Sequence, residues 1–194
     1  MEHWGYYIRG RLLETLGRRD AAIAAYRHAL LVDPGFSRAT NRTAYLLASQ
    51  ERYEEAEAYF QRALDSDPGN AVAHFNLGYT REKLGRLEQA VESFREATRL
   101  NSKIDRAWYG MGLCHAHLGR HDEAATALEH AALLQPMNPH AWYALGMAHH
   151  AVRNPVRVKE VIRHLVRFDP RMARRLILES ESTDLAYLVK DLVV

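Results

Sequence analysis

Histidine is the residue type in this sequence that most readily does chemistry, and the chain has 11 of them. Imidazole nitrogens bind zinc when several of them converge on one point, often with a carboxylate. His117 and His121 are four residues apart, but Gly119 between them ends the helix that would align them. His115 and His149 occupy matching places in two similar segments and are expected to be buried and hydrogen-bonded. With no HExxH pattern, we predict no metal site and no cofactor.

Nucleophilic and nucleotide-dependent chemistry also lacks a sequence signature. Cys114 is the single cysteine, so it forms no intramolecular disulfide, and its apolar neighbours predict a buried thiol. No G-x-S-x-G, P-loop or GxGxxG pattern occurs. Acidic residues cluster at predicted helix starts, where they complement the helix dipole: Glu54, Glu55, Glu57, Asp122 and Glu123. We therefore predict no catalytic residues and a protein that is not an enzyme, with an enzyme as the third-ranked interpretation.

The amino-acid composition indicates a folded protein with a net charge close to zero. Its 194 residues include 47% hydrophobic residues, with 26 Lys plus Arg against 24 Asp plus Glu. That length can bury a substantial core, and a net charge of +2 argues against a general nucleic-acid or membrane binder. The basic stretch from Arg153 to Arg175 has no interleaved aromatic platform and is interpreted as a solvated outer face, with nucleic acid, acidic lipid or an acidic partner as alternatives.

Targeting signals are not evident in the sequence. The opening residues lack the basic and apolar regions of a signal peptide, and no stretch approaches 18 uninterrupted apolar residues. These observations predict a cytoplasmic protein without a membrane anchor. The predominance of arginine over lysine favours a bacterial source.

The sequence repeats itself with a period of 34 residues, most clearly in AWYGMGLCHAHLGR (107–120) and AWYALGMAHHAVRN (141–154). The same spacing divides most of the chain, without insertions, into units 3–36, 37–70, 71–104, 105–138 and 139–172. A large apolar residue recurs at position 24 of each unit and small residues recur at positions 8, 20 and 27. Position 8 holds Gly10, Ala44, Gly78, Gly112 and Gly146. Small residues at positions 8 and 20 predict that two helices approach closely in every unit.

Turn residues separate two predicted helices in each unit. Gly17, Gly85 and Gly119 stand at position 15, where a helix end favours a residue that tolerates positive φ. Prolines at position 32 stop the second helix: Pro34, Pro68, Pro136 and Pro170. Glu51 replaces the turn glycine in the second unit, and in the fifth unit Asn154 and Pro155 are suited to cap and begin the second helix.

The pattern resembles the tetratricopeptide repeat (TPR) over about residues 3–172. The W-x2-L-G spacing carries the resemblance, together with the following Ala, large apolar, Ala and Pro positions; it is formed by Trp108, Met111 and Gly112, and by Trp142, Leu145 and Gly146. The resemblance implies an all-α fold, a right-handed solenoid of five helix-turn-helix repeats.

The two ends of the repeat array differ. Residues 173–194 are predicted to form capping helices over the last repeat, with an apolar face formed by Leu185, Leu188, Val189 and Leu192. The first repeat has no corresponding cap, and it begins with Trp4, Tyr6, Tyr7 and Ile8. Either this end meets a partner or the chain is truncated.

A candidate binding face follows from the helical angles. In the first helix of each unit, positions 4, 7, 8 and 11 form the core face and positions 2, 5, 9, 12 and 13 the opposite face. The resemblance implies that the opposite face lines a concave groove for extended or helical peptides. Its aromatic and apolar stripe predicts an interaction site, unless each ring packs on the neighbouring repeat. The predicted groove residues are Tyr7, Arg11, Arg38, Asn41, Arg42, Tyr45, Phe75, Asn76, Tyr79, Lys83, Arg106, Tyr109, Leu113, His140, Tyr143 and Met147.

The groove residues favour a particular ligand chemistry. Basic side chains outnumber Glu14 and Glu82 on this face, so a protein segment with apolar and acidic residues is the predicted partner. Chaperone-binding TPR domains use Lys and Asn where this chain has Tyr7, Arg11 and Arg42, so a chaperone C-terminus is not expected. We predict a non-enzymatic adaptor; the alternative is a homo-oligomeric scaffold that assembles through the first repeat.

Overall fold

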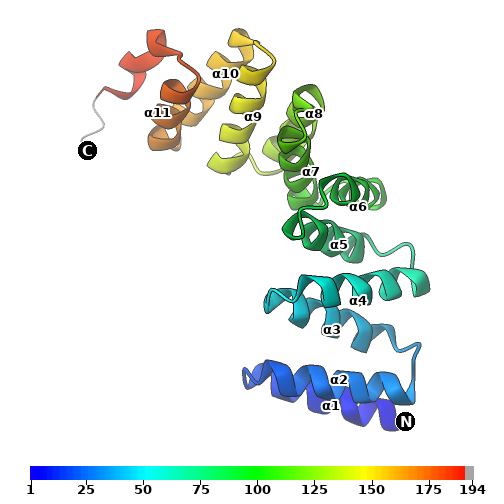
Figure 1. The fold of residues 1–194 in the computed structure, drawn as a ribbon. Helices are drawn as coiled ribbons and strands as arrows, with labels where there is room; N and C mark the ends of the chain where they lie inside the picture. Colours follow the sequence, from blue (N-terminus) through cyan, green and yellow to red (C-terminus); the bar gives the residue numbers. More distant parts are fainter. Residues whose placement is uncertain (191–194) are drawn as a thin grey trace. The chain divides into compact units, whose positions relative to one another are not determined.

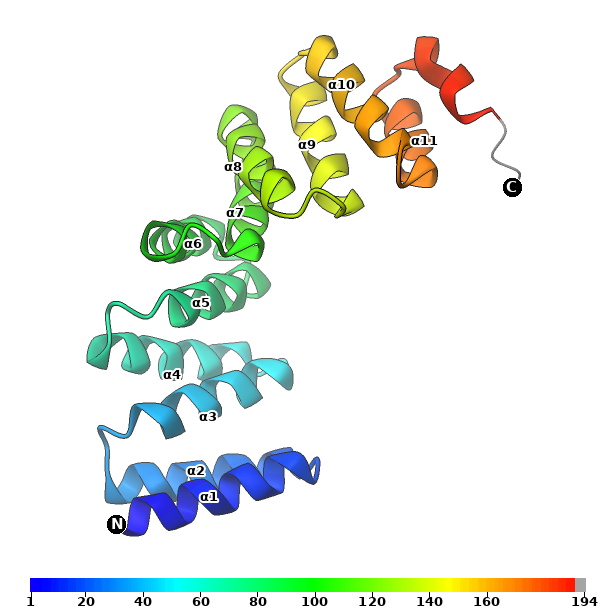
Figure 2. The ribbon, with the colours of Figure 1, turned by 180° about the vertical axis from the view of Figure 1, so that it is seen from behind.

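The computed structural model describes residues 1–190, and all regular elements in this range are helical (Figure 1). They belong to two compact units, Met1–Asn101 and Ser102–Val194. Unit 1 contains α1 (Glu2–Thr15), α2 (Arg19–Val32), α3 (Ser37–Ser49), α4 (Tyr53–Ser66), α5 (Ala71–Lys83) and α6 (Leu87–Leu100). Unit 2 contains α7 (Asp105–His117), α8 (His121–Leu134), α9 (Pro139–Ala151), α10 (Pro155–Val166), α11 (Pro170–Glu179) and the 3-10 helix η1 (Thr183–Val189). Figure 2 shows the same helices from behind.

The helices of unit 1 pack as the pairs α1 with α2, α3 with α4, and α5 with α6. Their second helices bury the aromatic side chains Tyr26, Phe60 and Phe94. A methyl group added at Gly10 would lie 2.4 Å from Tyr26 Cε1, and one added at Gly78 would lie 2.7 Å from Phe94 Cδ1. The predicted close approach at position 8 is therefore confirmed, because each ring occupies the space that a glycine leaves open.

Unit 2 follows the same scheme with one difference. A methyl group at Gly112 would lie 2.6 Å from Leu128 Cγ within the α7–α8 pair, whereas one at Gly146 would lie 2.4 Å from Leu176 Cδ2 in α11. The space above Gly146 is thus filled by α11, while Ile162 is buried elsewhere in the same core.

The turn between the two helices of each of the five repeats contains a residue with positive φ, either a glycine or the residue that replaces it. Gly17, Gly85 and Gly119 have φ values of 72°, 72° and 73°, while Glu51 and Arg153 have 60° and 55°. The predicted turn chemistry is confirmed at the glycines. Glu51 and Arg153 adopt the same left-handed conformation at a cost, because their Cβ atoms crowd the following carbonyl oxygen.

Replacing Glu51 by glycine is expected to raise the free energy of unfolding by about 0.5–1 kcal/mol, because relief of the left-handed strain outweighs the greater entropy of glycine in the unfolded chain. The reciprocal change Gly85→Ala should lower it by about 1 kcal/mol, since conformation alone opposes the new methyl group, which would find no atom within 4 Å. Urea denaturation followed by circular dichroism checks both, and equal effects of the same sign would contradict the strain argument.

In each of the second to fifth repeats, one side chain forms a hydrogen bond with the backbone carbonyl at position 32 of the repeat before it. Trp108 Nε1 donates to the Ser102 carbonyl at 2.9 Å, and Trp142 Nε1 donates to the Pro136 carbonyl at 2.9 Å. In unit 1, Arg62 donates to the Pro34 carbonyl and His74 bonds to that of Pro68. Trp108 also stacks on His130 with ring centroids 4.3 Å apart, and Trp142 packs on His164 in a tilted arrangement with centroids 4.0 Å apart. The tryptophan positions therefore join helices and successive repeats.

The C-terminal elements differ in part from the sequence prediction. Asn154 and Asp169 cap α10 and α11 by accepting hydrogen bonds from the backbone amides of Arg157 and Met172, so the predicted start of α10 is confirmed. The second predicted capping helix is the short 3-10 helix η1, which follows a turn at Glu181 with φ of 56°. Of its predicted apolar face, Leu192 lies outside the described residues.

Candidate functional site

The predicted groove residues of unit 1 lie on α1, α3 and α5, the first helices of the pairs, and α3 contacts α5 directly. None of them is buried in the described structure. The exposed ones are Arg11, Arg38, Tyr45, Tyr79 and Lys83, and the half-buried ones are Tyr7, Asn41, Arg42, Phe75 and Asn76. This face is accessible along the first helices.

Two tyrosines dominate the accessible aromatic surface of this face. Tyr45 on α3 is 53% exposed and Tyr79 on α5 is 39% exposed. Both occupy position 9 of their units, so they lie on neighbouring helices at the same level. The Lys83 ammonium lies 5.1 Å from the centre of the Tyr79 ring, a cation–π geometry. These two rings can supply contact area to a ligand at little cost in side-chain entropy.

Tyr7 is held in an aromatic cluster of its own chain. Its ring centroid lies 5.8 Å from that of Trp4, 5.2 Å from Phe36 and 5.5 Å from Tyr26. The Arg38 guanidinium lies 5.3 Å from the centre of the Trp4 ring. The cluster joins α1 to the segment that leads into α3, so Tyr7 and Trp4 have a structural role. Sequence reasoning missed Phe36 because it precedes a helix and lies outside the helical pattern.

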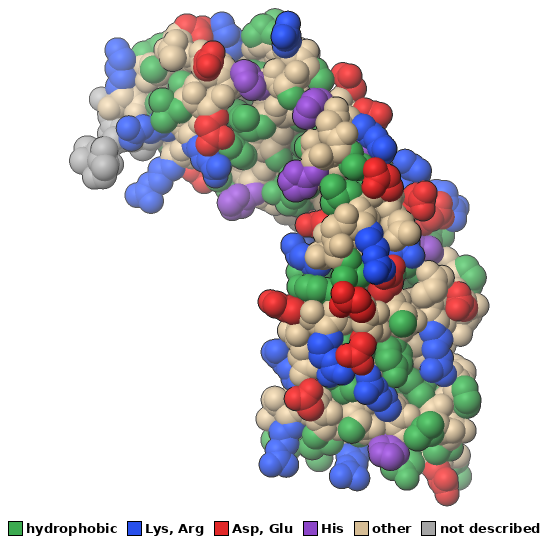
Figure 3. All heavy atoms as spheres, viewed as in Figure 1, with side chains coloured by type: hydrophobic (Ala, Val, Ile, Leu, Met, Phe, Trp, Pro, Cys, Tyr) green, Lys and Arg blue, Asp and Glu red, His purple; other side chains and the backbone are tan. Residues whose placement is uncertain are grey.

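The positive charge of the unit 1 face is partly neutralised within the chain. Glu14 accepts hydrogen bonds from the Tyr26 hydroxyl at 2.7 Å and Arg42 Nη1 at 3.2 Å, and its carboxylate lies 3.9 Å from Arg11 Nε. Burial, together with the bond to Glu14, raises the pKa of Tyr26. Figure 3 shows basic and acidic side chains interspersed on the side of the molecule that it presents. Because Glu14 pairs with Arg42 and Arg11, the field on the first-helix face of unit 1 is weaker than the count of basic residues indicates.

The two asparagines of this face differ in availability. The Asn41 side-chain amide donates to the Ser37 carbonyl at 3.0 Å. The Asn76 side-chain amide has no hydrogen-bond partner among residues 1–190, and it is half-buried. Asn76 is therefore the asparagine whose amide is available to a peptide backbone.

In unit 2 the predicted groove residues lie on α7 and α9, which contact each other. Arg106 and His140 are exposed, and the half-buried ones are Tyr109, Leu113, Tyr143 and Met147.

Helix α11 extends the unit 2 face, which the sequence did not indicate. The Tyr143 hydroxyl donates to Glu179, and the Arg175 guanidinium lies 4.5 Å from the centre of the Tyr143 ring. Burial and the Glu179 bond raise the pKa of Tyr143. α11 begins at Pro170 rather than near residue 173, where the 34-residue period would begin a sixth unit. The 12-residue α10, shorter than the 14-residue α8, accounts for most of this offset.

The histidines are placed as structural residues. His115 and His149 are buried, as predicted, and so is Cys114. The predicted hydrogen bonding of His149 is wrong, because neither of its ring nitrogens has a partner within the described part of the chain. Burial, reinforced by the charge of Arg157, lowers the pKa of His149 and favours its neutral form. Among residues 1–190, no three His, Cys, Asp or Glu side chains are grouped to hold a metal ion.

The basic residues from Arg153 to Arg175 are engaged in part. Arg157 pairs with Glu129 and with Glu160, and Lys159 Nζ lies 2.7 Å from the Asp184 carboxylate. Such exposed pairs contribute little to stability. They reduce the charge available for phosphate groups, which favours the interpretation of this stretch as a solvated surface.

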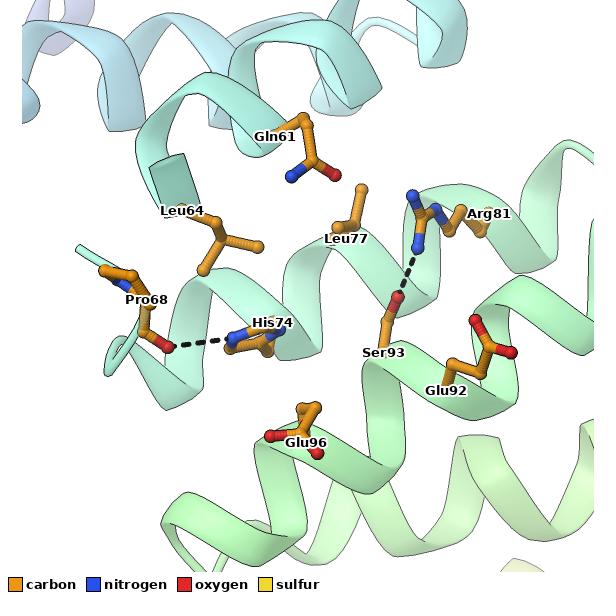
Figure 4. A pocket seen from close by; sticks show the side chains of 9 residues that line it. All are labelled: Gln61, Leu64, Pro68, His74, Leu77, Arg81, Glu92, Ser93 and Glu96. Carbon is orange, nitrogen blue, oxygen red and sulfur yellow. Dashed lines mark hydrogen bonds between the residues drawn. The ribbon is translucent and has the colours of Figure 1, made fainter. Parts of the chain in front are cut away.

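A hollow of about 270 Å³ lies among α4, α5 and α6, shown in Figure 4. Three of its polar side chains are already paired: Arg81 donates to Ser93 at 2.9 Å and to Glu57 at 2.9 Å, and His74 bonds to the Pro68 carbonyl at 3.0 Å. These bonds connect the helices that line the hollow. We therefore assign it to the packing of unit 1.

Stacked helix pairs with exposed aromatic and charged first-helix faces define an α-helical repeat protein. Two family models, both described as tetratricopeptide repeat, match this chain, one at residues 7–71, 75–133 and 119–155 and the other at 47–102. The chain belongs to the tetratricopeptide repeat family, whose fold supports protein–protein interaction. A comparison with curated protein sequences gave no match. No helix within residues 1–190 has the length and apolar character to cross a membrane.

Several solved TPR structures are similar to this chain. YrrB, described as a TPR protein with an unusual peptide-binding site, is 24% identical with a TM-score of 0.79, over 91% of this chain and 90% of its own. MamA is 20% identical with a TM-score of 0.79, over 99% and 97%. PilF of Pseudomonas aeruginosa is 21% identical with a TM-score of 0.72, over 95% and 87%. At these identities the likeness establishes the fold.

Proposed function

We propose that this protein is a non-enzymatic adaptor whose first-helix faces bind a segment of a partner protein. The observation that carries the proposal is the pair of accessible rings Tyr45 and Tyr79 on the adjacent helices α3 and α5. Large aromatic side chains left accessible on adjacent helices mark interaction surfaces. The peptide-binding site named for YrrB gives a precedent in a protein of this fold.

The ligand of this proposal is an extended or helical segment with apolar anchors and a few acidic residues. Tyr45 and Tyr79 receive the apolar side chains. Lys83, which lies over the Tyr79 ring, and Arg38, which is exposed on the same helix as Tyr45, attract the carboxylates. Asn76 holds the ligand backbone. In unit 2, Tyr109, Leu113 and Met147 provide the corresponding apolar positions.

The test compares wild type with the double variant Tyr45→Ala/Tyr79→Ala. Both side chains are accessible, so truncation should leave the fold intact, whereas Tyr143 is tied to α11. Acidic-apolar peptides selected from a displayed library against wild type should bind the double variant at least about tenfold more weakly in isothermal titration, because truncated anchor residues each cost about 1–2 kcal/mol.

The matched control for this titration is Tyr187→Ala, which removes an exposed aromatic from η1. It should leave the affinity unchanged. Equal binding by wild type and the double variant, with both folded by circular dichroism, would show that the ligand does not use this face.

A self-associating scaffold is the second candidate function. It is favoured by the exposed apolar side chains of α1, among them Ile8. Light-scattering mass that rises with protein concentration would support it, and a constant monomer mass would contradict it.

A further inference from the structure

Within residues 1–190, one face of α1 is exposed at positions that are buried in other first helices. Positions 3 and 10 of α3, α5 and α9 are buried, and these helices pack against the preceding second helices α2, α4 and α8. These positions hold Ala39, Ala73 and Ala141, and Leu46, Thr80 and Ala148. In α1 the same positions hold Gly5 and Leu12, and both are exposed. α1 therefore presents to solvent a face that the repeat architecture otherwise covers with a helix.

This face is apolar and shaped for helix packing. Ile8, Leu12 and Leu16 are 63%, 61% and 64% exposed and follow one another at intervals of four residues. Gly5 lies on the same side, and a methyl group there would meet no atom within 4 Å. The bare backbone at Gly5 permits close approach beside a ridge of aliphatic side chains. Gly5, Ile8, Leu12 and Leu16 are called the end face of α1.

The end face is distinct from the aromatic residues near the start of α1. Trp4 packs on Phe36 with centroids 5.0 Å apart, and Tyr6 stacks on His28 at 5.5 Å. These rings have partners in their own unit. Figures 1 and 2 show the α1–α2 pair at one end of unit 1, and within residues 1–190 α1 packs mainly against α2.

Two observations point to a second copy of the chain as the occupant. Within residues 1–190, the last second helix, α10, is covered by α11 and η1, so it offers no open face to the α1 of another copy. The charges around α1 are also arranged for self-pairing: Glu2 is its first residue, while Arg18 precedes α2 in the turn after α1 and Arg19 is the first residue of α2. None of these three side chains has an ion-pair partner in the described part of the chain.

We propose that two copies pair through the end face of α1 about a two-fold axis, with their α1 helices antiparallel. This arrangement places Ile8 against Leu12 of the partner subunit and Glu2 near Arg18 and Arg19 of the partner subunit. It is a closed dimer, since each copy uses the same surface. It deepens the second candidate function and rests on the self-association considered there. The binding face at Tyr45 and Tyr79 stays free, so a dimer presents two such faces and gains avidity for a partner with two segments.

The experiment measures the mass of the full chain by sedimentation velocity over a wide concentration range. Wild type should shift from monomer to dimer and no further. Leu12→Glu should raise the dimer dissociation constant about a hundredfold or more, because the two-fold axis brings two buried carboxylates into one interface. The matched control is Leu133→Glu, which changes an equally exposed leucine (63%) on α8 and should leave the dimer unchanged.

Charge exchange tests the antiparallel direction. Glu2→Arg and the pair Arg18→Glu/Arg19→Glu should each weaken the dimer several-fold, and the triple variant should restore it, because opposite charges again face each other. A monomer at all concentrations would overturn the proposal together with the scaffold function. A dimer insensitive to Leu12→Glu, or mass growing beyond a dimer, would overturn the two-fold pairing alone. Peptide titration of the Leu12→Glu variant tests the adaptor function independently.

Discussion

Replacing Phe94 by alanine is expected to lower the free energy of unfolding of unit 1 by about 3–5 kcal/mol, the usual cost of truncating a buried phenylalanine. Its ring is 1% exposed and occupies the space above Gly78, where a methyl group would come within 2.7 Å. The Phe75 ring packs on another side of the Phe94 ring, with ring centroids 6.0 Å apart. Because helical backbones hold the walls of this site, the cavity left by the ring cannot collapse fully.

Urea denaturation gives the total loss for Phe94→Ala, and hydrogen exchange with mass spectrometry locates it. We expect lost protection in α5 and α6, since each repeat of a solenoid depends mainly on its neighbours. Tyr45→Ala is the control, because it truncates an accessible aromatic of the same unit and should cost about 0.5 kcal/mol or less. A loss below about 1 kcal/mol for Phe94→Ala would contradict the packing described at Gly78.

Replacing Leu176 by alanine is expected to lower the stability of unit 2 by about 2–5 kcal/mol. Leu176 is fully buried and fills the space at Gly146 that the second helix fills in the α5–α6 and α7–α8 pairs. α11 packs on both α9 and α10. We therefore predict that α11 is the cap that closes the apolar surface of the last repeat.

The Leu176 experiment has a control in the same helix. Leu178 is 65% exposed, and Leu178→Ala should change the free energy of unfolding by no more than about 0.5 kcal/mol. Hydrogen exchange in the Leu176→Ala variant should increase in α9 and α10. If both variants had the same small effect, α11 would be an appendage without a capping role.

The structure also changes which residues are best suited to test the proposed binding face. Tyr109 and Tyr143 are the most evident pair from the sequence, because they stand in the clearest repeats. Tyr143, however, donates to Glu179 and lies beneath Arg175, so its truncation would disturb the contact between α9 and α11. Tyr45 and Tyr79 report on binding with less effect on folding, since much of each ring is already in contact with water.

Features of short sequence segments by themselves determined most of the fold. The 34-residue period, the small residues at positions 8 and 20 and the turn residues at Gly17, Gly85 and Gly119 predict the helix pairs and their closest contacts. These features could be predicted because each is a property of a short segment. They are the helical periodicity, the need for positive φ in a turn, and the space that a small side chain leaves for a neighbouring helix. The first-helix surface face follows from the same angles.

Tertiary structure decided which residues of that face are available. Arg42 and Arg11 share Glu14, Tyr7 joins a cluster with Phe36, and Tyr143 bonds to α11. Each of these contacts except that between Arg11 and Glu14 depends on a side chain from another element, and the position of α11 departs from the repeat period. The open end face of α1 is likewise a tertiary property, because a helix face is exposed or buried according to what packs against it. The sequence specified the repeating unit, and the packing of successive units determined which of its surfaces can meet a partner.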